Sequence, residues 1–185
     1  MPPPLLPRPW IRRERGEARD YTVVRVREDR VLDPRDGSEH PRVALDCADW
    51  VTVLAVTRED ALILVRQFRF GIWDVTLEAP GGLIDEGEAP AAAAARELEE
   101  ETGYVAGRLV SLGWTHPNPA WQNNRCHAFL ALDCEKAHGG RPDEGEDLVV
   151  ELRPRASIPE LVRSGEVSHA LVVVAFYLEQ LARER

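Results

Sequence analysis

The sequence predicts a mixed α/β fold in which a mixed β-sheet carries helices on both faces. Two β-branched, apolar runs, WVTVLAV at 50–56 and ALILV at 61–65, are joined by a charged turn and predict a central hairpin. Because strands that are covered on both faces are apolar throughout, these runs belong in the middle of a layered domain. Helical segments interspersed among several further strands favour a sandwich of helices around that sheet.

Composition limits the classes of protein that the chain can belong to. Its 185 residues, 44% hydrophobic and 30% charged, predict a globular protein with a full core. A net charge of −9 disfavours extended binding to nucleic acid. The start, MPPPLLPRPW, is broken by prolines and is no signal peptide, and the apolar run 170–177 is too short to span a membrane. We therefore expect a cytoplasmic protein.

The cysteines indicate no disulfide framework and no zinc site. Cys47, Cys126 and Cys134 are odd in number and show no C-x-x-C spacing. In a reducing compartment they are expected to be small buried hydrophobic side chains.

The N-terminal part reads as an arm followed by short strands. Five prolines precede Trp10, a charged run follows, and residues 1–20 are predicted to be irregular. Strands are predicted at 21–26 and at Val31-Leu32, the second leading into the turn DPRDGSEHP. An arm of this length has no evident core of its own, so we expect it to pack on a second subunit.

The rest of the chain alternates strands with helices. The hairpin strand at 61–65 continues through RQFRF, and further strands are predicted at 75–79, 109–114, 126–132 and 148–152. THPNPAWQNN and the polar segment 134–147 are predicted loops. Pro159 opens a short predicted helix at 158–164, and Ser168 is the predicted cap of a last helix that ends near 182.

The helix predicted at 90–102 carries the most informative residues. Pro90 suits its first position, five alanines follow, and Gly103 suits a left-handed end. At 3.6 residues per turn, Glu97, Glu100 and Glu101 share one face. The opposite, apolar face is predicted to contain Ala91, Ala94, Ala95 and Leu98. Three neighbouring carboxylates repel each other, and Arg96 alone is too little to neutralise them. A solvated acidic face is the plain alternative, but hard cations such as Mg²⁺ prefer such an oxygen cluster.

The spacing around this helix resembles a known motif. Gly82, five residues, Glu88, seven residues and then RELEEETGY match the Nudix box, G-x5-E-x7-R-E-U-x-E-E-x-G-U, at every fixed position. Gly81-Gly82 after Pro80 also predicts a tight approach of the backbone to the helix. The resemblance implies a Nudix hydrolase with the α/β/α sandwich of that family. It places an N-terminal arm with strands at 1–47, which is expected to form a dimer, and the catalytic domain at 48–185.

The resemblance also implies roles for the residues of the box. Glu97 and Glu101 are implied ligands of Mg²⁺, for which Mn²⁺ is a possible substitute. Glu100 supports or shares a metal ion, and the carbonyl of Gly81 completes the shell. The structural positions of the box are Gly82, Glu88, Arg96 and Gly103. Among these, Glu88 and Arg96 are expected to form an ion pair that orients the loop and the helix.

The sequence around the box is more specific for the substrate. RQFRFG, TLEAPGGLIDEGE and PDEGED resemble the ADP-ribose pyrophosphatase and nucleoside-diphosphate-sugar branch of the family. This implies Mg²⁺-dependent cleavage of an ADP-ribose-like molecule to a nucleoside monophosphate and a sugar phosphate. In that branch an N-terminal arm reaches across the partner subunit, which again predicts a homodimer.

Several residues are candidates for contacting such a substrate. Arg69 is expected to face the diphosphate, or else to be a surface arginine of its strand. Glu78 binds ribose or base, or only anchors the turn. Trp121 and Arg125, with their neighbours Asn123 and Asn124, are candidates for lining a sugar or base pocket. Trp10 and Trp50 are candidate platforms for a base, or pack in the core or a dimer interface.

The general base is expected outside the helix. Glutamates that hold a cation are poor proton acceptors, because the cation lowers their pKa. The loop PDEGEDL at 142–148 offers separate carboxylates, and the resemblance points to Glu146 first and Glu144 second, with Glu100 as the alternative on the helix.

Two other functions stay open: hydrolysis of damaged nucleoside triphosphates, and a non-catalytic nucleotide sensor, which the intact glutamates disfavour.

Overall fold

The chain divides into two compact units in the computed structural model, which describes residues 6–141, 145 and 147–184. The first unit comprises Met1–Ala48 and Asn118–Asn124, and the second comprises Asp49–Pro117 and Arg125–Arg185. The segment 118–124 was predicted as a loop of the catalytic domain, but it packs with the N-terminal strands. Leu45 N–H, for example, donates to Trp121 O at 2.7 Å.

A small antiparallel sheet forms the first unit. Its central strand, β3 (Val24–Leu32), pairs with β4 (Glu39–Cys47) over nine residue pairs. The shorter strands β1 (Ile11–Glu14) and β2 (Arg19–Asp20) also pair with β3. The whole unit therefore depends on one strand whose sequence, VRVREDRVL, is mostly charged.

The predictions for this part of the chain were largely wrong. The arm at 11–20 is not irregular, because it contributes β1 and β2, and the two strands predicted at 21–26 and 31–32 are one continuous strand that begins at Val24. β4 was not predicted at all. Pro41 and the charges around it conceal a strand whose backbone groups are satisfied by pairing with β3.

The second unit contains a seven-stranded mixed sheet. Its order is β11-β6-β5-β10-β8, with β7 also paired to β6 and β9 to β10. The bounds are β5 Trp50–Thr57, β6 Ala61–Arg69, β7 Asp74–Glu78, β8 Tyr104–Val105, β9 Arg108–Thr115, β10 Cys126–Lys136 and β11 Val149–Pro154. β5 and β10 run parallel, and the other pairs are antiparallel. The predicted strands of this half are confirmed, although β8 was missed and β10 is longer than predicted.

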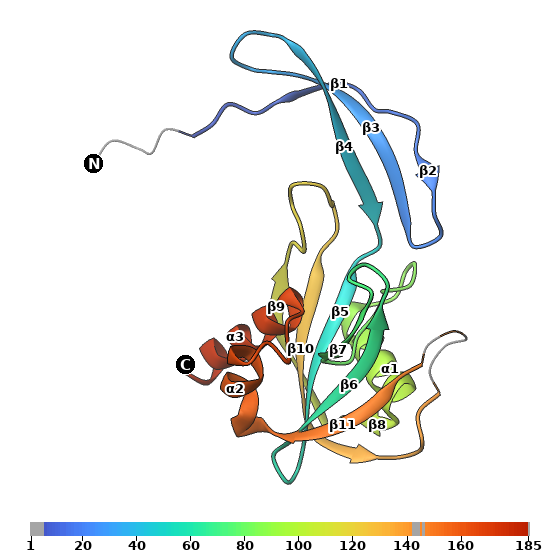
Figure 1. The fold of residues 1–185 in the computed structure, drawn as a ribbon, viewed down its shortest axis with the longest axis vertical. Helices are drawn as coiled ribbons and strands as arrows, with labels where there is room; N and C mark the ends of the chain where they lie inside the picture. The colour runs from blue at the N-terminus through green and yellow to red at the C-terminus, as the bar shows by residue number, and fades with distance from the viewer. Residues whose placement is uncertain (1–5, 142–144, 146, 185) are drawn as a thin grey trace. The chain divides into compact units, whose positions relative to one another are not determined.

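Helices cover both faces of this sheet, so the predicted sandwich is confirmed. α1 (Pro90–Thr102) lies on one side, and α2 (Ile158–Arg163) and α3 (Ala170–Arg183) lie on the other (Figure 1). A 3₁₀ turn, η1 (Arg155–Ser157), precedes α2. The predicted cap of the last helix was wrong by one residue. His169 is the N-cap of α3, and its side chain makes no capping hydrogen bond. Among the described residues, no helix is both long and apolar enough to cross a membrane.

Alternating side chains of the central hairpin supply two separate cores. Leu54 and Leu64 pack on the α3 side with Phe176, whereas Val53 and Ile63 pack on the α1 side. The buried residues of α1 on that side include Ala93, Ala94 and Leu98. The predicted apolar face was therefore partly wrong: Ala94 and Leu98 are buried, but Ala91 and Ala95 are exposed. Because residues 91–95 are all alanine, the sequence does not distinguish the buried ones, and packing against the sheet determines which alanines are covered.

Candidate metal and catalytic site

A glycine turn brings the backbone directly against α1. After β7, Pro80 O accepts a hydrogen bond from Val53 N–H at 2.8 Å, and Gly82 O accepts one from Val51 N–H at 2.9 Å. A Cβ atom on Gly81 would lie 2.2 Å from Val51 O, and one on Gly82 would lie 2.5 Å from a carboxylate oxygen of Glu97. Backbone atoms of β5 leave no space for a side chain at Gly81, whereas a side chain at Gly82 would displace the Glu97 carboxylate, which confirms the predicted close approach.

Arg96 is the centre of a cluster of charged side chains, which we call the Arg96 cluster. Its guanidinium donates to both carboxylate oxygens of Glu88, at 3.0 and 2.9 Å, so the predicted ion pair is present. The same group reaches Glu97 at 2.9 Å and Glu100 at 3.0 Å, and it also bonds Leu83 O at 3.0 Å. The hydrogen bond from Arg96 lowers the pKa of Glu88, and the carboxylates raise the pKa of Arg96. One arginine thus joins the loop of the box to its helix.

Glu101 meets the glycine turn from the other end of the helix face. Its residue is 5% exposed, and Gly81 N–H donates to its carboxylate at 3.0 Å. Because Glu97 lies against Gly82, the two glutamates flank Gly81-Gly82. The structure therefore brings together Gly81, Glu97 and Glu101, three of the residues that were expected to hold a metal ion.

The oxygen atoms of this site are suited to a hard cation but are not arranged as a finished cage. Among the residues that the structure describes, no three His, Cys, Asp or Glu side chains form a group spaced to hold an ion. The carboxylates of Glu97 and Glu100 are instead directed at Arg96. With Glu88, three carboxylates bond the guanidinium of Arg96, so these four side chains together carry a surplus of negative charge. An oxygen-only donor set of this charge fits Mg²⁺ or a similar divalent ion.

The end of α1 is capped by the segment 136–141. Gly103 ends the helix in the left-handed conformation, with φ 69°. Lys136 Nζ donates to Thr102 O at 2.5 Å, and Arg141 N–H donates to Glu100 O at 2.6 Å. A cavity of about 330 Å³ lies beside the helix and is lined by Arg96, Glu99, Glu100, His138 and Arg141. Sequence reasoning missed this anchoring, because the polar segment gave no periodic signal.

The two loop glutamates that were expected to act as the base, Glu146 and Glu144, lie outside the described residues. Glu100, the alternative on α1, is described. Its carboxylate is partly exposed and bonds Arg96.

Arg69 and Glu78, both expected to bind substrate, bind each other. The guanidinium of Arg69 donates to the two oxygens of Glu78 at 2.8 and 2.7 Å, and Thr76 adds a bond at 2.5 Å. Glu78 is 2% exposed. Its burial acts to raise its pKa, but the hydrogen bonds from Arg69 and Thr76 lower it overall. His169 Nε2 lies 3.9 Å away, and burial lowers the pKa of this histidine.

The aromatic candidates are divided between the units. Trp10 and Trp121 belong to the first unit, where the Arg42 guanidinium lies 4.9 Å from the centroid of Trp10. Trp50 starts β5 in the second unit and is half-buried. Arg125 lies in the second unit with its guanidinium 4.3 Å above Trp114, a residue that sequence reasoning did not single out. Trp114 lies at the end of a strand, just before the Pro-rich loop, and this position is the signal that was overlooked.

A glycine turn packed on the carboxylates of one helix, within an α/β/α sandwich, is the arrangement of a Nudix hydrolase. The chain belongs to this family, since the model of the NUDIX domain matches residues 48–171.

Individual proteins agree with this assignment. The chain is 37% identical to the ADP-ribose pyrophosphatase of Bacillus subtilis (strain 168) over 132 residues, which cover 71% of each protein. It is 30% identical to the GDP-mannose pyrophosphatase of Citrobacter koseri over 75% of this chain and 77% of that one. A solved structure titled "Crystal structure of ADP compounds hydrolase" superimposes with a TM-score of 0.84, covering 98% of this chain and 97% of the other at 22% identity. That last likeness concerns the fold.

Proposed function

We propose that this protein hydrolyses the diphosphate bond of nucleoside diphosphate sugars and that ADP-ribose is the first compound to try. The products are a nucleoside monophosphate and a sugar phosphate. The observation that carries the proposal is the placement of Glu97 and Glu101 on either side of the Gly81-Gly82 turn. The names of the relatives, ADP-ribose pyrophosphatase and GDP-mannose pyrophosphatase, support this substrate class.

Nudix hydrolases generally need a divalent metal ion, and we propose Mg²⁺, with Mn²⁺ as a substitute. Glu97, Glu101 and the carbonyl of Gly81 would hold it, and Glu100 would support or share it. The surplus negative charge of the Arg96 cluster and its oxygen-only donors support this ligand set. When bound, the ion supplies the positive charge that the diphosphate oxygens need in the transition state.

The remaining steps belong to side chains of the chain itself. Arg96 and Glu88 keep the loop of the box on α1, and the packed glycine turn keeps Glu97 and Glu101 beside it. Glu146, or else Glu144, would take the proton of the attacking water on a carboxylate oxygen, with Glu100 as the alternative. Arg69, held by Glu78, would face the diphosphate.

A homodimer formed through the N-terminal strands is also proposed. Several apolar side chains of the first unit are exposed, among them Ile11, Tyr21, Val23 and Val43. A small sheet with this much exposed apolar surface gains stability when a second copy covers it. Sedimentation at micromolar concentration is expected to give twice the chain mass, and a single species of 20.8 kDa would contradict the proposal.

A turnover screen tests the proposed function directly. ADP-ribose, GDP-mannose, UDP-glucose and the nucleoside triphosphates are incubated with Mg²⁺ or Mn²⁺, with Glu97→Gln as the inactive control. Turnover of a nucleoside diphosphate sugar that the control lacks supports the proposal. A clear preference for triphosphates selects triphosphate hydrolysis instead, and nucleotide binding without turnover selects a sensor.

A further inference from the structure

An exposed tryptophan and an arginine lie stacked at the adjoining ends of β9 and β10. The guanidinium carbon of Arg125 lies 4.3 Å from the centroid of Trp114, whose residue is 46% exposed. His116 approaches the same tryptophan edge-on, with 5.1 Å between ring centroids. In the part of the chain that the structure describes, no carboxylate forms an ion pair with Arg125. The pair therefore places a guanidinium over one face of a half-exposed tryptophan ring, with the Asp49 carboxylate bonded to the Arg125 backbone and not to its guanidinium.

The backbone of Arg125 is fixed on both sides. Its N–H donates to Asp49 Oδ1 at 2.7 Å, and its carbonyl accepts a bond from Trp50 N–H at 2.8 Å. Asp49 is in turn 3.4 Å from His127 Nε2 through its other oxygen. Because the main chain is held, less conformational entropy remains to be lost when a ligand binds to the side chain.

Strand register puts this pair on the same face of the sheet as the Nudix helix. Trp114 is the partner of His127, and His127 is the partner of Val51, which packs in the α1-side core. Val51 N–H in turn donates to Gly82 O. Residues in one such row point to the same side of a sheet, and three strand spacings separate Trp114 from the glycine turn, about 14 Å. That separation is comparable to the length of one nucleotide.

We propose that Trp114 and Arg125 form the platform on which the nucleobase of the substrate stacks, which we call the Trp114 platform. This rests on the proposed function, with the diphosphate over Gly82. Aromatic rings and guanidinium groups both stack on bases, and the donors of Arg125 can meet acceptors on a base edge or on phosphate.

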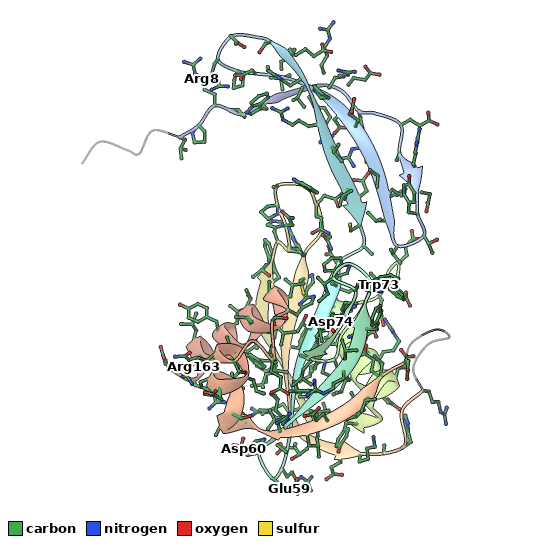
Figure 2. The ribbon with its side chains drawn as sticks, viewed as in Figure 1. Arg8, Glu59, Asp60, Trp73, Asp74 and Arg163 are labelled. Carbon is green, nitrogen blue, oxygen red and sulfur yellow. The ribbon has the colours of Figure 1, made fainter. Side chains whose placement is uncertain are left out.

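Two other aromatic groups of the second unit fit a base less well. Trp50 is the partner of Cys126, one residue before the pair formed by His127 and Val51, so alternation directs Trp50 to the opposite face. Trp73 is exposed at the β6–β7 turn beside Asp74, at the other end of the sheet from Glu59 and Asp60 (Figure 2). Its ring packs edge-on against Phe68 and Phe70, and no described residue places a cation over it.

Product binding tests the platform separately from catalysis. The dissociation constants of AMP, GMP and ribose 5-phosphate are measured by calorimetry on the full-length protein with Mg²⁺. Trp114→Ala is expected to weaken binding of the preferred nucleotide about tenfold or more, whereas binding of ribose 5-phosphate, which lacks a base, stays unchanged. Trp114→Phe, which keeps an aromatic face, is expected to recover most of the affinity. Trp73→Ala, the matched control, is expected to bind like the wild type.

The same variants separate this inference from the proposed function. For ADP-ribose turnover, Trp114→Ala is expected to raise KM with little change in kcat, because the base does not take part in the chemical step. Wild-type turnover combined with unaltered nucleotide binding in Trp114→Ala overturns the platform and leaves the proposed function intact. If nucleotide binding depends on Trp114 but the wild type turns over no diphosphate sugar, the proposed function is overturned and the platform stands. Should Trp114→Ala fail to fold, Arg125→Gln decides, since unchanged nucleotide affinity in that variant overturns the platform.

Discussion

Two of the arginines that join several carboxylates, Arg27 in the first unit and Arg96 in the second, differ in burial and in charge balance. Arg27, on β3 of the first unit, has a side chain that is 5% exposed and pairs with Asp29 and Asp46. Arg96, on α1 of the second unit, is 30% exposed and pairs with three glutamates. We call the first group the Arg27 cluster.

The charge balance of the two clusters is opposite. Asp29 and Asp46 are each bound by a further arginine, Arg12 at 3.2 Å and Arg15 at 2.9 Å, so three guanidinium groups serve two carboxylates. In the Arg96 cluster one guanidinium serves three carboxylates. A buried charge needs full pairing, because desolvation is costly, whereas a partly exposed cluster with surplus negative charge can accept a cation. The first arrangement is suited to holding a fold together and the second to binding a metal ion.

The largest expected effect is on stability, from Arg27→Met. Removing Arg27 leaves the buried Asp29 and Asp46 with one arginine each, and we expect the free energy of unfolding to fall by about 3 kcal/mol. Arg30→Met is the matched control, since Arg30 lies on the same strand but is exposed, and its ion pair with Glu28 is long, at 3.7 Å. Its effect on the free energy of unfolding should stay within about 0.5 kcal/mol. Calorimetric unfolding of both variants measures the difference. Similar stabilities for the two variants would show that burial does not determine how much the Arg27 cluster contributes to the free energy of unfolding.

The next effect is on catalysis, from Glu97→Gln and Glu101→Gln. Each is expected to lower kcat for ADP-ribose about a hundredfold or more while the protein stays folded, because the amide cannot replace the charge of the carboxylate. Glu99→Gln is the matched control, since Glu99 is on the same helix but faces His138 at 3.2 Å. Steady-state kinetics and Mn²⁺ binding, measured by electron paramagnetic resonance, give the two readouts. If either variant keeps most of its activity, that residue is not a ligand.

The second unit could be predicted from its sequence because its signals are local. Pro90 and Gly103 mark the ends of α1 within one residue, and the apolar runs of β5 and β6 identify central strands without reference to other segments. The close approach at Gly81-Gly82 follows from the motif alone. These features depend on residues that are neighbours along the chain.

The first unit and the contact between Arg125 and Trp114 could not be predicted in this way, because they depend on distant partners. β4 pairs with β3 and bonds the segment 118–124, where Asn123 donates to Asp46 at 2.8 Å across 77 positions. Arg125 reaches Trp114 only because β9 and β10 are adjacent in the sheet. The propensities of single residues do not predict contacts between segments that are distant in the sequence.

A smaller effect is expected from Arg96→Met, and it distinguishes the two clusters most directly. Without Arg96 the surplus negative charge rises, so the metal-free protein should lose about 1 kcal/mol and the gain in stability on adding Mg²⁺ should increase by a similar amount. Thermal unfolding with and without Mg²⁺ measures this gain. Arg27→Met should leave it as in the wild type. A smaller gain in Arg96→Met would mean that Arg96 mainly shapes the site and does not compete with the cation.

The smallest expected effect concerns the acid sensitivity of Glu88. The hydrogen bond from Arg96 lowers the pKa of Glu88 below its ordinary value of 4.5. A carboxyl whose pKa is lowered by folding stabilises the protein above its unfolded pKa and loses that contribution as the pH falls through the folded value. The contribution of Glu88 is therefore complete at neutral pH and is lost as the pH falls below 4.5 and through the lowered pKa of the folded state.

Glu88→Gln isolates this contribution. At neutral pH the variant is expected to be less stable than the wild type by no more than about 1 kcal/mol, because the pair lies near the surface and is screened. Urea unfolding at successive pH values down to about pH 3 should show the two proteins converge, since protonated Glu88 and glutamine are alike in charge. Asp46→Asn provides the comparison from the buried cluster: burial acts to raise the pKa of Asp46, but hydrogen bonds from Arg27 and Arg15 lower it overall. Its loss at neutral pH should be larger and should fade only at lower pH, because the ordinary pKa of aspartate, 3.8, is already below that of glutamate. A gap between Glu88→Gln and the wild type that widens in acid would contradict the assigned direction of the Glu88 shift.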